Sequence, residues 1–119
     1  MKKHLRLRAG CGRLLLTLRL FRTGNDVQIL LDGGHAHIGV VALAAPGKNA
    51  SGHLDVPSHR EGELASRMAR RVANALCCTV CVSAGIHYEN ISKEEIRTVE
   101  QLADTLTRRC VTALGGETV

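Results

Sequence analysis

The sequence predicts a two-layer α+β fold in which two helices cover one face of a mainly antiparallel sheet, in the order strands, helix, strand, helix. Three observations predict it. Leucine recurs at every second position over residues 14–20, which is the period of a half-buried strand. Apolar residues recur at helical spacing after Ser58 and again after Ser92. Two apolar helix faces are buried most simply against one side of a single sheet.

The first elements of the chain are predicted to be strands joined by tight turns. Residues 4–8 alternate polar side chains with leucine, and glycines at 10–12 make a turn. The alternation over residues 13–21 is the clearest strand signal in the sequence. The residues at 23–26 have turn chemistry, and the same period continues over 27–31. The two strands therefore form an antiparallel hairpin.

A third apolar run follows, over residues 37–44. It predicts another strand, with Gly39 as a bulge or a point of close backbone approach. Residues 45–57 are rich in proline, glycine, asparagine and serine and are interpreted as a loop.

The second half of the chain alternates helix and strand. Ser58 and Glu61 have the spacing of a capping box, as do Ser92 and Glu95. A strand is expected between the two helices, over residues 79–83. The predicted apolar stripes are Leu64, Ala65, Met68, Ala69, Val72, Ala75 and Leu76 in the first helix, and Ile96, Val99, Leu102, Ala103, Leu106 and Cys110 in the last.

Length and composition limit the function. A chain of 119 residues suits one domain, expected over residues 1–119. Tyr88 and Phe21 are its two aromatic residues, so base stacking is not expected. The formal charge of +5 arises partly from basic residues near the start, and without an aromatic platform it predicts no nucleic-acid partner.

Membrane and redox signals are also weak. No apolar run reaches the length of a membrane span, so no membrane partner is predicted, and five cysteines, an odd number, suit a reducing compartment. The expected location is therefore the cytoplasm. Cys78 and Cys81 have a C-x-x-C spacing, but without a second pair they are interpreted as buried core thiols.

Three histidine-bearing turns are the candidates for function. The first, Gly33-Gly34-His35-Ala36-His37, forms either a phosphate-binding nest or an ordinary turn between strands. If a strand begins at His37, then His35 and His37 share one face.

The other two turns also leave alternatives open. His59 is expected at the first position of a helix, where it accepts from backbone N–H groups, binds a cation or faces water. His87 follows a strand end, and Asn90 either binds a ligand or stabilises the turn.

Imidazoles from these turns form a candidate three-nitrogen metal site. The H-E-x-x-H, Walker A and G-x-G-x-x-G fingerprints are absent, and no nucleophile elbow or carboxylate pair is evident. The sequence therefore favours a binding protein over a catalyst.

Three blocks resemble the LpdD-like prenylated-flavin chaperones, a family of accessory subunits of gallate and hydroxybenzoate decarboxylases. They are the residues 37–44 after Gly33-Gly34, the residues 57–65, and the residues 84–91. Their order and spacing match from about residue 33 to the last helix, so the resemblance covers most of the chain.

The resemblance implies a small non-catalytic accessory protein that binds prenylated FMN, or FMN, and supplies it to a UbiD-type aromatic acid decarboxylase. Metal-assisted binding of the cofactor phosphate is expected in this setting, with a divalent ion at His37, His59 and His87. The expected cofactor-binding residues are Gly33, Gly34, His35, His37, Ile38, Gly39, His59, Gly85, Ile86, His87 and Asn90.

Two further classes remain as alternatives. One is a small metal-dependent hydrolase or isomerase that uses the same three histidines, and the other is an interaction module without a ligand. A homodimer is expected, because Leu15 and Phe21 lie on the strand face that the helices would leave uncovered.

Overall fold

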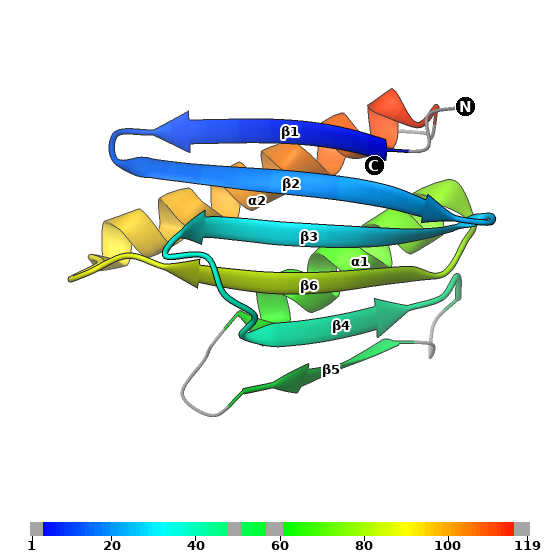
Figure 1. Ribbon diagram of the computed structural model, residues 1–119, viewed down its shortest axis with the longest axis horizontal. Coiled ribbons are helices and arrows are strands. Elements are labelled where there is room, and N and C mark those ends of the chain that lie inside the picture. The colour runs from blue at the N-terminus through cyan, green and yellow to red at the C-terminus, as the bar shows by residue number, and fades with distance from the viewer. Residues whose placement is uncertain (1–3, 48–50, 57–60, 116–119) are drawn as a thin grey trace.

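A six-stranded sheet with two helices packed against one of its faces forms the protein (Figure 1). The computed structural model describes residues 4–47, 51–56 and 61–115. The elements are β1 (His4–Cys11), β2 (Leu14–Thr23), β3 (Asp26–Gly34), β4 (Val40–Ala44), β5 (Ser51–Asp55), α1 (Gly62–Leu76), β6 (Val80–His87) and α2 (Lys93–Ala113). The predicted α+β class and the placement of both helices on one face are confirmed.

The strands are ordered β1-β2-β3-β6-β4-β5 across the sheet. β1, β2 and β3 are consecutive antiparallel neighbours, so the predicted hairpin is confirmed. Gly24, in its turn, has a φ of +61°, a conformation that glycine adopts without steric cost.

β6 is inserted between β3 and β4 and runs parallel to β3 but antiparallel to β4. The sheet is therefore mainly antiparallel, with one parallel pair. Because β3 and β6 run in the same direction, their carboxyl ends meet at one edge of the sheet, and this edge holds most of the predicted site residues.

Three predicted boundaries were wrong. β4 begins at Val40 rather than at residue 37, because residues 35–39 cross from the end of β3 to the start of β4. β6 continues past residue 83 to His87, where it is still paired with β3. The predicted loop at 45–57 contains β5, an edge strand that pairs with β4.

The two helices differ in how they begin. α2 has the predicted capping box: the Ser92 side chain accepts from Glu95 N, and the Glu95 side chain accepts from Ser92 N. α1 begins at Gly62 with Glu61 as its N-cap and without a side-chain cap bond. The expected role of Glu61 as the third residue of a capped helix was therefore wrong, and Ser58 and His59 lie outside the described residues.

The core lies between the helices and the inner face of the sheet. Leu18, Val82, Met68 and Leu106 are among its fully buried side chains. All five cysteines are free thiols. Cys78 is buried as predicted, whereas Cys81 is only half-buried and lies outside the core, so that part of the prediction was wrong. Burial raises the pKa of the Cys110 thiol to about 12, which keeps this thiol protonated and unreactive.

The opposite face of the sheet has no helix over it within the described residues (Figure 1). We call it the open face. Large apolar side chains are exposed on it, namely Leu15, Phe21, Leu30, Val41, Leu43 and Leu54. Over the described ranges, neither helix is long and apolar enough to cross a membrane.

Candidate functional site at the ends of β3 and β6

The first and third predicted turns meet at the end of the parallel pair. β3 and β6 are paired as far as Gly34 and His87, and the chain then folds back across β6 toward β4 (Figure 1). The backbone N–H of His35 donates to the carbonyl of His87 (2.9 Å), and that of Gly39 donates to the carbonyl of Ala84 (2.8 Å). Segments distant in sequence thus form one compact corner, which we call the strand-end corner.

Two glycines make this close approach possible. A Cβ at Gly85 would overlap the carbonyl oxygen of His37, and one at Gly34 would overlap that of His87. Gly34 also has a φ of +67°, which other residues rarely adopt. These glycines therefore allow neighbouring backbone segments to pack directly against each other. Gly34 is also exposed at the surface.

The imidazoles that come together are those of His35 and His87, whose ring centroids lie 6.5 Å apart. The expectation that His35 and His37 share a strand face was wrong, because both lie in the loop. Nδ1 of His37 instead lies 2.8 Å from the carbonyl oxygen of His35. A carbonyl can only accept, so Nδ1 donates, and the neutral ring then has its lone pair on Nε2.

The side chain of His87 has its own carboxylate neighbour. Its Nε2 lies 3.3 Å from Oε1 of Glu89, a contact that orients the ring. Within the described ranges, no group of three or more His, Cys, Asp or Glu residues could hold a metal ion. The predicted set of His37, His59 and His87 stays a prediction, since His59 is outside those ranges.

The other predicted cofactor-binding residues differ in how exposed they are. Gly33 and Gly39 are buried, Ile86 is half-buried, and Ile38 is 65% exposed. Asn90 is exposed and has a φ of +52°, a conformation in which asparagine is enriched. The turn-stabilising interpretation therefore explains Asn90 without a ligand.

The segment after β6 is fastened to β2 by contacts that the sequence did not reveal. The Tyr88 hydroxyl accepts from the N–H of Leu15 (2.8 Å) and donates to its carbonyl (2.9 Å). The Arg13 guanidinium donates to the Glu89 carbonyl and forms an ion pair with Glu95 (2.8 Å). Together these contacts hold the strand that carries His87.

The ion pair perturbs both of its partners. The hydrogen bond from Arg13, followed by that from Ser92 N, lowers the pKa of Glu95 from 4.5 to about 2. The same contact raises the pKa of Arg13. The charged form of Glu95 is therefore the one that holds the start of α2 to the β1–β2 turn.

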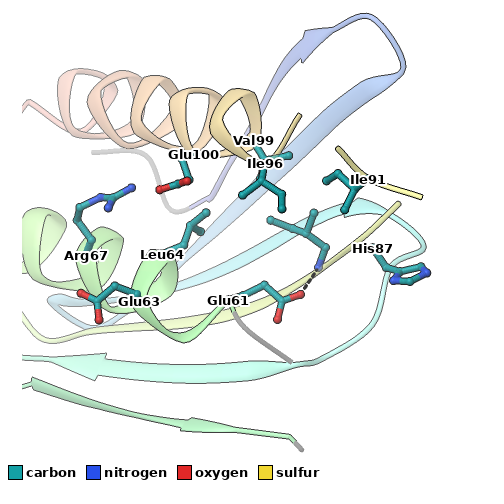
Figure 2. A pocket seen from close by; sticks show the side chains of 10 residues that line it. Glu61, Glu63, Leu64, Arg67, His87, Ile91, Ile96, Val99 and Glu100 are labelled. Atoms are coloured by element: carbon teal, nitrogen blue, oxygen red, sulfur yellow. Dashed lines mark hydrogen bonds between the residues drawn. The ribbon is translucent and has the colours of Figure 1, made fainter. Parts of the chain in front are cut away.

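A cleft of about 480 Å³ adjoins the corner on the helix side. It lies between the first turns of α1 and α2, and His87 stands at one end of it (Figure 2). Glu61 lies beside it and accepts from the N–H of Ile86 at 3.3 Å. The cleft is lined by Glu61, Glu63, Leu64, Arg67, Ile86, His87, Ile91, Ile96, Val99 and Glu100.

A hydrogen-bonded serine, histidine and aspartate connect β5 to α1. The Ser66 hydroxyl lies 2.9 Å from Nδ1 of His53, whose Nε2 lies 3.3 Å from Oδ2 of Asp55. Ser66 is only 3% exposed, so its oxygen cannot reach a substrate carbonyl as a nucleophile must. The arrangement holds the edge strand against the helix, and no sequence motif indicated it.

The fold is that of a small α+β protein whose sheet has helices on one face. The sequence profile described as "Prenylated flavin chaperone LpdD-like domain" matches residues 10–115. The chain therefore belongs to this family, as the resemblance predicted. It is a non-catalytic accessory protein of the chaperone type, which decides against the metal-dependent hydrolase or isomerase.

Two known proteins are similar to the chain. Protein LpdD of Lactiplantibacillus plantarum is 30% identical over 96 residues, which cover 76% of this chain and 71% of that protein. A solved structure described as "Crystal Structure of a Novel Chaperone Complex for Yeast 20S Proteasome Assembly" has a TM-score of 0.60. That match covers 95% of this chain and 96% of the other at 7% identity, so it concerns the fold alone.

Changing Gly85 to alanine should destabilise the protein by about 1–3 kcal/mol, because the new methyl group has no room against the His37 carbonyl. Gly52→Ala is the matched control, since a Cβ there meets nothing within 4 Å. Urea unfolding followed by circular dichroism measures both. Equal midpoints for the two variants would show that residues 35–39 are not packed on β6 as described.

Acid should weaken the fold through Glu95. Because its folded-state pKa is lowered from 4.5 to about 2, the ion pair stabilises the folded protein above pH 4.5, and this contribution disappears as the pH falls toward 2. The melting temperature of Glu95→Gln should therefore fall less between about pH 5 and pH 2.5 than that of the unmodified chain. Parallel curves would contradict the assigned ion pair.

Proposed function

We propose that the protein binds prenylated FMN, or FMN, at the strand-end corner and supplies it to a UbiD-type aromatic acid decarboxylase. The observation that carries the proposal is the juxtaposition of His35 and His87 beside the exposed Gly34. Family membership supports the choice of cofactor.

The chemistry of the corner suits the phosphate end of a flavin mononucleotide. The imidazole of His35 supplies a ring N–H donor, and an exposed glycine allows a phosphate to approach the backbone closely. The His87 ring, oriented by Glu89, would take part through the metal ion proposed below. The chain's formal charge of +5 favours an anionic ligand in general. These residues would hold the phosphate, while the bound flavin itself supplies the decarboxylase with its reactive ring system.

The ring system needs apolar surface. Ile38, the residue after His37, is exposed. Leu15, hydrogen-bonded through its backbone to Tyr88, is exposed on the open face. Aliphatic side chains rather than aromatic ones would thus contact the flavin ring. A second copy covering the open face would enclose this surface.

A divalent metal ion at His37, His59 and His87 is part of the proposal. Neutral imidazole is the form of histidine that a metal ion requires. In this arrangement the ion would join the cofactor phosphate to the protein.

Flavin affinity should depend on the two neighbouring imidazoles. We expect His35→Ala/His87→Ala to bind prenylated FMN at least about tenfold more weakly, which corresponds to about 1.4 kcal/mol. His4→Ala is the matched control because His4 lies far from the strand-end corner. His4 pairs with Phe21 near the carboxyl end of β2, whereas Gly33 pairs with Leu16 near the amino end of that strand. Absorbance retained by the protein through gel filtration, followed by an equilibrium titration, measures the affinity.

A second arm of this titration examines the metal. Dialysis against a chelator should weaken flavin binding by the unmodified chain, and added divalent ions should restore it. If the double histidine variant and the His4 variant bind equally well, the flavin site is elsewhere. If the chelator has no effect, the metal is removed from the proposal.

We also propose that the open face joins two copies into a homodimer. Exposed Leu30, Val41 and Leu43 share this face with Leu54, which is 81% exposed. Light scattering should therefore give twice the mass of one chain, and Leu43→Arg should shift the protein toward the monomer. Ile96→Arg, on the helix side, is the control and should remain dimeric. A single-chain mass at every accessible concentration would contradict the dimer.

A further inference from the structure

The cleft between α1 and α2 has features that flavin binding does not use. We propose that it binds a segment of a partner protein in which an apolar side chain is flanked by lysine or arginine. The cleft is bounded by the first turns of both helices and by the end of β6 (Figure 2).

The floor of the cleft is aliphatic. Leu64 reaches from α1 toward Ile96 and Val99 on α2, and Ile91 closes the end next to β6 (Figure 2). Ile96 is 46% exposed although it lies on the side of α2 that faces α1. Burying such side chains under an incoming leucine or phenylalanine removes apolar surface from water, which is the main source of affinity in small grooves.

The rim of the cleft is acidic although the whole chain is basic. Glu100 stands on the α2 side and Glu63 on the α1 side, where Glu63 is 3.6 Å from Arg70 but its side chain is 78% exposed. Glu61 lies deeper, near β6, and accepts from the N–H of Ile86. Arg67 also lines the cleft, but its guanidinium is paired with Asp104 at 3.3 Å. The N-termini of α1 and α2 carry partial positive charge from the helix dipoles, which offsets part of the negative charge of the rim. In α1 the carboxylate of Glu63, in the first turn, already compensates this partial positive charge.

These charges favour a polypeptide over a phosphate-bearing small molecule. Carboxylates at the rim disfavour a phosphate in the cleft, and they favour a cationic partner. Glu63 and Glu100 are exposed on separate helices, so an extended segment can place one basic side chain beside Glu100 and another beside Glu63, in place of Arg70, while its apolar residue enters the floor. Rim charges of this kind give specificity and speed association.

The cleft and the corner share His87. A partner segment in the cleft would therefore lie next to the cofactor, in a position suited to cofactor transfer. This role in transfer rests on the proposed function, whereas the docking itself does not.

The test uses the isotope-labelled full chain and, as its probe, a twelve-residue peptide in which leucine alternates with lysine and arginine. Amide chemical-shift changes should concentrate on Leu64, Ile96 and Glu100. Glu100→Lys should weaken peptide binding by about fivefold or more, close to 1 kcal/mol, and Ile96→Ser should weaken it as well. Glu94→Lys, a charge reversal on α2 outside the cleft, is the matched control and should change affinity by less than about twofold.

Several results would overturn the proposal. The first two are the absence of binding and chemical-shift changes that map to β4 and β5 on the open face. A third is that a peptide with glutamate in place of its basic residues binds as tightly as the basic peptide. A fourth is that Glu94→Lys weakens binding as much as Glu100→Lys does. Circular dichroism of each variant verifies its folding. Flavin affinity is measured separately on the unmodified chain, so a loss of the flavin proposal leaves the docking result interpretable, and the reverse also holds.

Discussion

The close approach of backbone to backbone at the end of the parallel strand pair is the constraint on which the candidate site depends. The carbonyl of His37 occupies the space that a side chain at position 85 would fill. Because Gly85 leaves that space empty, the chain can leave β3, cross β6 and enter β4 over the short segment 35–39. The hydrogen bonds from His35 and Gly39 to β6 then hold the crossing in place.

This crossing lies between the two surfaces for which we propose functions. The strand-end corner opens beside the uncovered face of the sheet, where exposed aliphatic side chains are available to a ring system and to a second copy. The cleft opens on the helix side, where carboxylates surround an aliphatic floor. His87 belongs to both, because it is the last residue of β6. A ligand on one side and a partner on the other would therefore meet at one strand end.

Sequence reasoning failed where stability came from distant partners. β5 consists of Ser51–Asp55 and lacks the β-branched alternation of a typical strand. It forms because its backbone pairs with β4 and because the side chain of His53 is hydrogen-bonded to Ser66 on α1. Likewise, β6 was expected to end near residue 83, but Tyr88 and Arg13 tie its continuation to β2 and the preceding turn. Contacts between residues so far apart along the chain leave no local pattern.

The sequence by itself determined the α+β class, the β2–β3 hairpin, the capping box of α2 and most of the apolar stripes of both helices, because each follows from local periodicity or from hydrogen bonds between near neighbours. Ile96, predicted in the buried stripe of α2, is instead 46% exposed. It also identified the glycine and histidine blocks of the candidate site. The tertiary structure decided that β6 inserts between β3 and β4, which brings the first and third blocks together and pairs His35, rather than His37, with His87. The physical reason is that strand order is set by burial and long-range pairing, which the spacing of residues along the chain does not encode.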